Sequence, residues 1–489
     1  MPSNPIHETF LTRQPAKAPF LETPDGRQMS YAQLRQEVAQ MAAALQSEGV
    51  TPGDRVLCQI AKSPAALVLY LATVAAGGVF VPLNTAYTPA ELAYFIEDAA
   101  PALLIIDDST EAARAVAEAQ ILRCVTPAAL SAAQVAPLAA PVPRVPDDLA
   151  AILYTSGTTG RSKGAMLSHD NLISNAKALC DHWQFTTSDV LLHALPVFHT
   201  HGLFVATNTV LLSGARMIFH GAFDIDQIAK DLPRASVIMG VPTFYSRMLA
   251  DPRFTRESMA HMRLVISGSA PLLADTHAAF EARTGHAILE RYGMTETNMI
   301  TSNPYRGPRR AGTVGQPLQG VSVRLATPDA QGIGGIEVRG PNVTRGYWQN
   351  AEKTKESFTA DGWFITGDLG QFDEGGYLSI VGREKDLVIS GGFNIYPKEI
   401  ESLIDALPEV EESAVFGVAH GDLGEVVAAA IVLRAGARLD AEAVLTALGP
   451  QLARFKLPRE LRFVDQLPRN AMGKVQKAEL RKLFEGETP

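Results

Sequence analysis

Short apolar runs alternate with amphipathic segments along the first 110 residues of the chain. Apolar residues at helical spacing predict helices that begin near Ser30, Ala65 and Pro89. Continuous apolar runs predict strands over residues 54–60, 79–83 and 102–106. Helices and strands that alternate in this way are typical of a parallel sheet with helices on its faces.

The same alternation resumes over residues 147–326, after an Ala- and Pro-rich stretch at 111–147 that we expect to lie on the surface. A second pattern begins near Lys385, with a strand at 386–389 and an amphipathic helix that starts at Pro397. Strands at 413–418, 426–433 and 461–464 and a helix over 441–455 follow. The sequence therefore predicts an α/β protein, with a large N-terminal domain (1–384) of sheets flanked by helices and a small α/β C-terminal domain (385–489).

Composition and charge exclude several classes of protein. The chain is 46% apolar and 19% charged, which is typical of a globular protein. Its net charge of −9 argues against nonspecific nucleic-acid binding. The longest apolar run, 65–76, is too short to span a membrane, and no charged-then-apolar leader is evident. Three widely spaced cysteines fit a reducing compartment, so we expect a cytoplasmic protein.

The stretch from Tyr154 to Gly164, YTSGTTGRSKG, carries the clearest chemical signal. Predicted strands at 149–153 and 165–167 flank it. Its glycines let backbone N–H groups turn inward around an anion, and its hydroxyls and Lys163 add donors, so the loop suits a polyphosphate. It is not a Walker A loop, which needs four residues between its glycines and a helix after them. A flexible hairpin is the alternative interpretation.

This loop resembles the signature of the acyl-adenylate-forming superfamily, which contains acyl-CoA synthetases, luciferases and peptide-synthetase adenylation domains. Six motifs follow the family order between Tyr154 and Lys477. The resemblance implies that the chain is an enzyme that uses ATP, Mg²⁺ and CoA. The ATP-binding residues that it implies are Thr155, Ser156, Gly157, Thr158, Thr159, Gly160, Lys163, Ala270, Tyr292, Gly293, Met294, Thr295, Asp368 and Arg383.

Two of these motifs would surround the reacting phosphate and the base. In the stretch from Arg291 to Glu296, the resemblance assigns Thr295 to the α-phosphate and Glu296 to Mg²⁺, a cation that takes few carboxylates. A helix capping box is the alternative interpretation of this stretch. The turn at 267–271, which contains Ala270, would pack against adenine, and a plain turn is an equal interpretation of it.

The C-terminal motifs supply a ribose contact and a mobile cation. A carboxylate can accept hydrogen bonds from both ribose hydroxyls, and the resemblance gives Asp368 that role with Arg383 beside it. Lys474 follows Gly473 and matches the catalytic lysine of the family, which stabilises charge on the reacting acyl phosphate. Without the other motifs, Lys474 would be read as a solvated surface lysine.

The resemblance also implies two half-reactions in two arrangements of the domains. Acyl-AMP forms first, and a thiol then displaces AMP after the small domain rotates about a hinge at Lys385. Ser390, Gly391 and Gly392 would then line the tunnel for the CoA pantetheine, because backbone without side chains leaves room for it. His199 would gate the acyl or pantetheine channel, although a lone histidine is more often structural.

Within the superfamily, the chain is most similar to the malonyl-CoA synthetases, in residues 195–203, 240–247, 267–270 and 290–296. A dicarboxylic acid needs a cationic partner for the carboxylate that does not react. Arg247 and Arg291 are the candidates, with help from Ser269 and with His199 nearby, and Met294 would lie against C2 of the acid. Malonate and methylmalonate both fit this description.

Three other functions compete with this interpretation. The acid could be a short monocarboxylate or an aromatic acid, which the arginines disfavour. The chain could be a stand-alone adenylation enzyme that loads a carrier protein, although only 15 residues follow Lys474. An inactive nucleotide-binding regulator is disfavoured by Lys163, Glu296 and Lys474. The family resemblance also suggests a lysine acetyltransferase acting on Lys474, which would remove its charge.

Overall fold

The computed structural model describes residues 4–108, 110–155, 162–390, 393–421, 423–469 and 474–486. The chain divides into two compact units. The N-terminal unit holds residues 1–323 and 338–364, and the C-terminal unit holds residues 324–337 and 365–489. The prediction of a large and a small α/β domain is confirmed. In the described parts of the chain, no helix is both long enough and apolar enough to cross a membrane.

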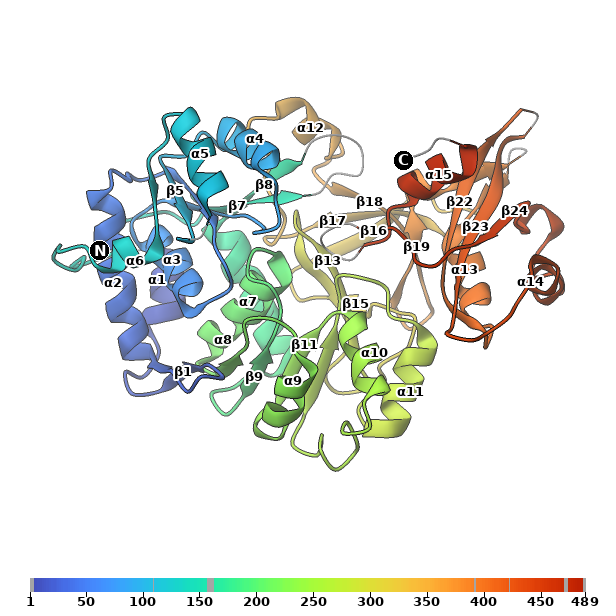
Figure 1. Cartoon of the computed structure of the whole chain (residues 1–489), viewed down its shortest axis with the longest axis horizontal. Helices are drawn as coiled ribbons and strands as arrows, with labels where there is room; N and C mark the ends of the chain where they lie inside the picture. The colour runs from blue at the N-terminus through green and yellow to red at the C-terminus, as the bar shows by residue number, and fades with distance from the viewer. Residues whose placement is uncertain are drawn as a thin grey trace. The chain divides into compact units, whose positions relative to one another are not determined.

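A six-stranded sheet of the N-terminal unit carries the phosphate-loop motif at one edge (Figure 1). Its strand order is β6-β5-β3-β4-β7-β8, and only the β7–β8 pair is antiparallel. The strands are β3 (Arg55–Gln59), β4 (Val79–Pro82), β5 (Leu103–Ile106), β6 (Cys124–Val125), β7 (Leu149–Thr155) and β8 (Lys163–Ser168). The strands predicted on either side of the loop are therefore present, and they pair with each other.

A nine-stranded sheet of the same unit has the order β15-β14-β13-β12-β11-β9-β10-β1-β2. Its central strands from β13 to β1 are parallel, and antiparallel pairs close both edges. The strands are β1 (Pro19–Glu22), β2 (Gln28–Ser30), β9 (Val190–His193), β10 (Arg216–Phe219), β11 (Val237–Gly240), β12 (Leu264–Ser267), β13 (Leu289–Met294), β14 (Asn298–Ser302) and β15 (Gln316–Pro317).

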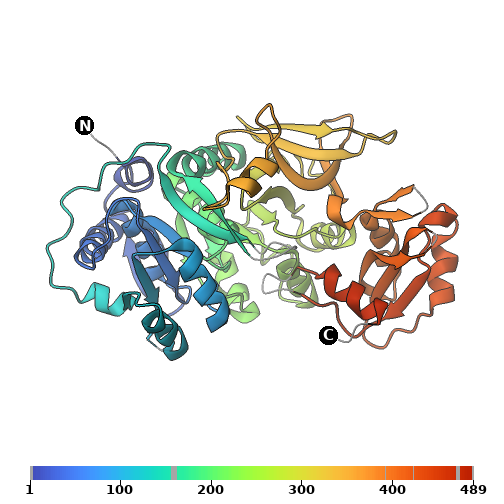
Figure 2. The same cartoon turned by 90° about the horizontal axis from the view of Figure 1, so that it is seen from above.

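Helices cover these two sheets (Figure 2). They are α1 (Pro5–His7), α2 (Tyr31–Ser47), α3 (Pro64–Ala75), α4 (Pro89–Ala99), α5 (Glu111–Ala119), α6 (Pro127–Ser131), α7 (His169–Trp183), α8 (Asn208–Ser213), α9 (Ile225–Asp231), α10 (Pro242–Ala250), α11 (Ala274–Thr284) and α12 (Ala351–Glu356). Shorter helical turns are η1 (Glu8–Thr12), η2 (His201–Thr207) and η3 (Leu232–Arg234), of which η1 and η2 are π-helical. Buried side chains of α2, α3 and α7 form one continuous core with strands of both sheets.

Several helix starts follow from local sequence. Ser30 and Thr88 form capping boxes at the starts of α2 and α4, in which the cap hydroxyl and the third helical side chain each satisfy a backbone N–H group. Ser63 precedes α3, which begins with Pro64, one residue before the predicted start near Ala65. The stretch at 111–147 is more structured than expected, because α5, β6 and α6 form there and β6 joins the sheet.

The C-terminal unit contains two sheets of its own. The four-stranded sheet β16-β17-β18-β19 consists of β16 (Ser322–Ala326), β17 (Gly334–Arg339), β18 (Phe364–Phe372) and β19 (Leu378–Arg383). Residues 322–323, 338–339 and 364 of these strands are assigned to the N-terminal unit. The second sheet consists of β20 (Val388–Ser390), β21 (Phe393–Ile395), β22 (Val410–His420), β23 (Gly424–Leu433) and β24 (Glu460–Phe463). The helical elements are η4 (Glu384–Asp386), α13 (Pro397–Asp405), α14 (Ala441–Leu448), η5 (Arg454–Lys456) and α15 (Lys477–Glu485).

The amphipathic helix predicted at Pro397 is confirmed as α13, and it buries Ile400 and Ile404 against β22 and β23. The helix predicted over 441–455 ends at Leu448, before Gly449. The compact division of the chain assigns residues 324–337 and 365–384 to the C-terminal unit. The hinge at Lys385 stays a prediction.

Candidate active site

The ends of the phosphate-loop motif are fixed by strand pairing. Thr155 and Lys163 are direct partners in the β7–β8 ladder. The Tyr94 hydroxyl donates to the Ser162 carbonyl at 2.6 Å, and the Tyr154 hydroxyl donates to Asp98 at 2.5 Å. A cleft lies against this end of the motif. It is lined by Tyr94, Asp98, Ser162, Lys163, Gly164, Trp348 and Asn350.

Five predicted residues of this loop lie outside the described residues. They are Ser156, Gly157, Thr158, Thr159 and Gly160. Gly391 and Gly392 of the predicted CoA tunnel lie outside them too. The roles of these seven residues stay predictions.

The second phosphate-side motif is a strand, a tight turn and a second strand. Tyr292, Gly293 and Met294 end β13, and Asn298 begins β14 with a positive φ of 48°. A side chain at Gly293 would collide with the carbonyl of Asn298, so the register shift there requires glycine. The alternative of a helix capping box is therefore wrong for this stretch.

This turn buries Glu296 and orients it. Glu296 is 5% exposed, and the Tyr347 hydroxyl donates to its Oε1 at 2.8 Å. The backbone carbonyl of Glu296 accepts from the N–H of Thr344 at 2.7 Å. No group of three or more His, Cys, Asp or Glu that could hold a metal occurs among the described residues. A single carboxylate suits Mg²⁺, which usually takes its other ligands from phosphates and water.

Arg291 carries a buried guanidinium, and some of its nitrogen atoms lack a partner among the described residues. It is 4% exposed, and its Nε and Nη2 have no hydrogen-bond acceptor among the described residues. Burial lowers the pKa of Arg291 from its usual value to about 9, so the side chain is still charged at neutral pH. A buried charge is costly unless an opposite charge and hydrogen bonds compensate it. This guanidinium therefore suits an anionic ligand.

Two further residues of the candidate site, Ser267 and His201, have buried polar atoms that lack a partner among the described residues. The Oγ of Ser267, at the end of β12, and the Nε2 of His201 are buried and have no hydrogen-bond partner in the parts of the chain that the structure describes. The other ring nitrogen of His201, Nδ1, lies 3.2 Å from the hydroxyl of Ser269, which has a positive φ of 71°. Burial, with Arg291 as a further cause, holds the pKa of His201 well below its usual value, so its ring is neutral. These groups supply hydrogen bonds without adding a second positive charge.

The remaining predicted residues of the acyl pocket have different surroundings. His199 is half-buried, and its Nδ1 accepts from the N–H of His201 at 3.3 Å. Ala270 is exposed in the turn after β12. Arg247 is exposed on α10, with its guanidinium 5.8 Å from the ring of Phe223, and so differs from the buried Arg291. The pairing of Arg247 with Arg291 on one carboxylate stays a prediction.

Sequence reasoning did not single out His201 or Ser267. His201 stands two residues after His199, in the stretch 195–203. An ordinary core histidine is also buried, but the Nδ1 of His201 contacts Ser269 and its Nε2 has no partner among the described residues.

In the C-terminal unit, Asp368 and Arg383 are brought together. They are opposite each other in the β18–β19 ladder, and Arg383 Nε lies 2.9 Å from Asp368 Oδ1. Asp368 is 3% exposed. Lys385 lies in η4, Ser390 is buried at the end of β20, and Lys474 is exposed. The predicted roles of these residues with ribose, CoA and the acyl phosphate remain untested.

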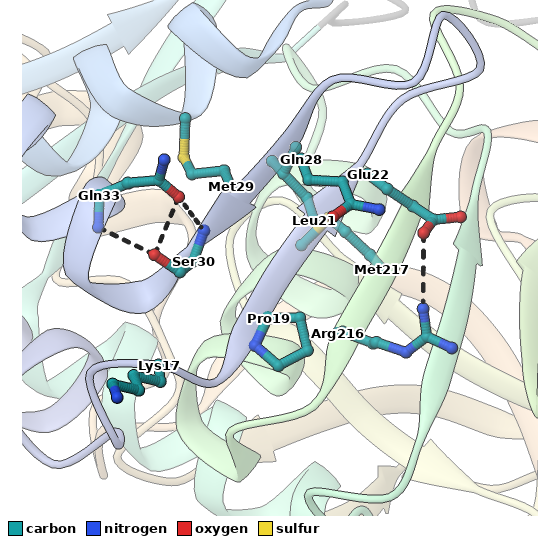
Figure 3. Close-up of a pocket in the computed structure, with 10 residues that line it drawn as sticks. All are labelled: Lys17, Pro19, Leu21, Glu22, Gln28, Met29, Ser30, Gln33, Arg216 and Met217. Atoms are coloured by element: carbon teal, nitrogen blue, oxygen red, sulfur yellow. Dashed lines mark hydrogen bonds and ion pairs between the residues drawn. The ribbon is translucent and has the colours of Figure 1, made fainter.

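A different cleft lies at the β1–β2 edge of the nine-stranded sheet (Figure 3). Its acidic residue, Glu22, lies 3.6 Å from Arg216 and also pairs with Arg234. Of the predicted site residues that the structure describes, none lines this cleft. Its lining is Lys17, Pro19, Leu21, Glu22, Gln28, Met29, Ser30, Gln33, Arg216 and Met217.

Comparisons with known proteins place the chain in one family. The family described as AMP-binding enzyme matches residues 8–348, and the AMP-binding enzyme C-terminal domain matches residues 399–474. The crystal structure of ATP-bound MatB from Rhodopseudomonas palustris is 54% identical, with a TM-score of 0.96 and 99% of each chain covered. Feruloyl-CoA synthase of Amycolatopsis sp. is 37% identical, with 94% of both sequences covered. Malonate–CoA ligase of Arabidopsis thaliana is 35% identical over 95% of this chain and 86% of its own length. The chain therefore belongs to the AMP-binding enzyme family.

Proposed function

We propose that the chain is an AMP-forming malonate–CoA ligase. In the first half-reaction, a malonate carboxylate attacks the α-phosphorus of ATP, which gives malonyl-AMP and releases pyrophosphate. In the second, the thiol of CoA attacks the acyl carbon, which gives malonyl-CoA and AMP. Methylmalonate is proposed as a second acid, because one methyl group at C2 keeps both carboxylates.

The observation that carries this proposal is the buried guanidinium of Arg291, whose Nε and Nη2 have no partner among the residues that the structure describes. Identity to these two relatives alone does not choose the acid, because the feruloyl-CoA synthase and the malonate–CoA ligase are 37% and 35% identical to this chain. Malonate has a second carboxylate that can satisfy the guanidinium, whereas acetate and propionate have none. A site built around a polar partner rejects analogues that lack this partner by large factors.

Each half of the reaction has its own proposed residues. Glu296, oriented by Tyr347, is the proposed ligand of Mg²⁺, which when bound offsets the negative charge of the phosphates. The loop at 155–163 and Thr295 would hold the phosphates, and Asp368 the ribose. Lys474 would stabilise the charge that develops on the acyl phosphate in the first half-reaction only.

The second half-reaction would use a different arrangement of the C-terminal unit. We propose that this unit turns about Lys385, so that Ser390, Gly391 and Gly392 line the pantetheine tunnel and His199 gates it. His201 and Ser269, which contact each other, would add hydrogen bonds to the distal carboxylate.

Two proposals concern the setting of the enzyme in its cell. We propose a cytoplasmic location, which agrees with widely spaced cysteines. We also propose that an acetyltransferase silences the enzyme at Lys474, which is exposed. Mass spectrometry of the protein purified from its own cells tests the acetylation.

The function is tested by measuring AMP release in the presence and absence of CoA. The acids are malonate, methylmalonate, acetate, propionate and ferulate. The proposal predicts rapid, CoA-dependent AMP release with malonate and little with the three monocarboxylates. A carrier-loading enzyme would instead form the adenylate and leave CoA unused, and a preference for ferulate would contradict the dicarboxylate assignment.

A further inference from the structure

Two ion pairs flank the stretch that leads to Lys474. On the N-terminal side, Arg469 pairs with Glu412 of β22. On the C-terminal side, Lys477 Nζ lies 2.6 Å from Glu401 Oε1 of α13. Arg469 and Val475 form an antiparallel bridge, and the N–H of Gln476 donates to the carbonyl of Pro468 at 2.8 Å. The chain is thus anchored on both sides of residues 470–474.

The Lys477–Glu401 pair is unusual for its position. Lys477 is the first residue of α15, where the partial positive charge of the helix N-terminus disfavours a cation. The preceding residue, Gln476, makes no side-chain capping bond. Helix stability alone would therefore favour an acidic residue here, so the lysine needs another explanation.

Glu401 provides a fixed and largely buried partner for this lysine. The side chains of Lys477 and Glu401 are only 18% and 11% exposed. Glu401 Oε1 also accepts from the backbone N–H of Val415 at 3.0 Å. This hydrogen bond holds the carboxylate against β22. An ion pair removed from water in this way is screened much less by salt than one on the surface.

We infer that Lys477 and Glu401 are positioning residues for Lys474, an inference that rests on the proposed role of Lys474 in adenylation. Only two residues, Val475 and Gln476, lie between the two lysines, so the anchor limits how far the backbone of Lys474 can move from the sheet. A displacement of about 1 Å at a reacting group can cost as much as 10²-fold in rate. Without the anchor, the Lys474 ammonium would reach the acyl phosphate less often.

The two half-reactions distinguish a positioning role of Lys477 from a role in folding. Lys477→Met should lower malonyl-adenylate formation, measured by pyrophosphate exchange, by at least ~10-fold. Thioester formation from supplied malonyl-AMP and CoA should stay within about twofold, because Lys474 is proposed to act only in the first step. Damage to the folded C-terminal unit would lower both half-reactions.

Further variants test whether the effect depends on the ion pair between Lys477 and Glu401. Glu401→Gln, which keeps an acceptor for Val415, should have the same selective effect, and Lys477→Arg should restore part of the activity. The double variant Glu401→Gln/Lys477→Met should lose no more than the worse single variant, because both changes remove one interaction. The matched control is Lys482→Met on the same helix, whose exposed pair with Glu479 spans 3.6 Å; it should change neither half-reaction.

Lys474→Ala distinguishes failure of this inference from failure of the proposed function. If Lys474→Ala loses adenylation and Lys477→Met keeps it, only the positioning inference is overturned. If Lys474→Ala keeps adenylation, the proposed role of Lys474 and the inference both fail. An equal loss of both half-reactions in Lys477→Met also overturns positioning in favour of a structural role.

Discussion

Gly268 lies against the guanidinium of Arg291, so closely that a Cβ atom added to Gly268 would be 2.6 Å from Arg291 Nε. Glycine is therefore needed here for space, since its φ does not lie in the left-handed region. The backbone of Gly268 therefore confines the guanidinium of Arg291 on this side. Because Gly268 precedes Ser269, the turn after β12 sets the positions of two groups proposed to bind the acid.

The first prediction concerns this contact. Gly268→Ala should displace the Arg291 side chain and lower kcat/KM for malonate by about 10-fold or more, since small misplacements at a reacting site have large effects. Steady-state kinetics with malonate and ATP varied in turn will measure it. The control is Gly221→Ala, where no atom of the described part of the chain lies within 4 Å of the added Cβ. Equal malonate kinetics in the two variants would show that the position of Arg291 is unimportant.

The second prediction concerns the tyrosine that orients Glu296. Tyr347→Phe removes the 2.8 Å hydrogen bond to Glu296 Oε1 and leaves the ring. Loss of such an outer partner typically weakens metal binding by about 10- to 100-fold, so the Mg²⁺ concentration for half-maximal activity should rise. Tyr396→Phe, which loses a similar bond to Asp329, is the control. An unchanged Mg²⁺ requirement in Tyr347→Phe would argue against Glu296 as the ligand.

The third prediction concerns the hinge. Proline fixes φ near −65° and restricts the backbone rotation that a hinge needs. Lys385→Pro should therefore spare malonyl-adenylate formation, measured by pyrophosphate exchange, and depress thioester formation. Lys385→Ala controls for loss of the side chain. Unimpaired overall turnover in Lys385→Pro would contradict the rotation about this residue.

The fourth prediction concerns the pH dependence of stability. Burial raises the pKa of Asp405 from 3.8 to about 6. The folded chain then holds this proton more tightly than the unfolded chain. Stability from Asp405 is therefore fully present below about pH 4 and is lost as the pH rises through about 6. Asp405→Asn keeps an acceptor for Ser413, so it should unfold at a higher temperature than the parent protein at pH 7.5.

Thermal unfolding at pH 7.5 and pH 4.5 checks this sign. At pH 4.5 the advantage of Asp405→Asn should shrink, because the parent carboxyl is then mostly protonated. An advantage of the same size at both values would mean that Asp405 does not titrate between them.

The sequence could predict strands with continuous apolar runs and helices with apolar residues at helical spacing. The strands at 149–153 and 165–167 are nearly uniform apolar runs, and α13 carries Ile400 and Ile404 one turn apart. The sheet β16-β17-β18-β19 was missed because its strands are partly exposed, which weakens their alternation. Helix α15 was missed because it buries only Leu480 and Phe484.

The sequence could predict which residue types form the candidate site, but it could not predict how deeply each side chain is buried. The sequence gives Arg247 and Arg291 the same chemistry, yet only Arg291 is buried. Burial depends on tertiary packing, since Gly268 and Tyr245, which lie far from Arg291 in sequence, set its surroundings. His201 was overlooked for the same reason.

The central claim is that a buried guanidinium selects a dicarboxylic acid, and the most direct measurement is kcat/KM for malonate and propionate with parent protein, Arg291→Ala and Arg247→Ala. The account predicts that the parent strongly prefers malonate. It also predicts that Arg291→Ala lowers kcat/KM for malonate by at least ~10²-fold with KM for ATP nearly unchanged. If Arg247 shares the carboxylate, Arg247→Ala should also lose malonate activity, and the double variant should lose less than the sum. A parent protein that prefers propionate, or an Arg291→Ala variant with unchanged malonate kinetics, would contradict the account.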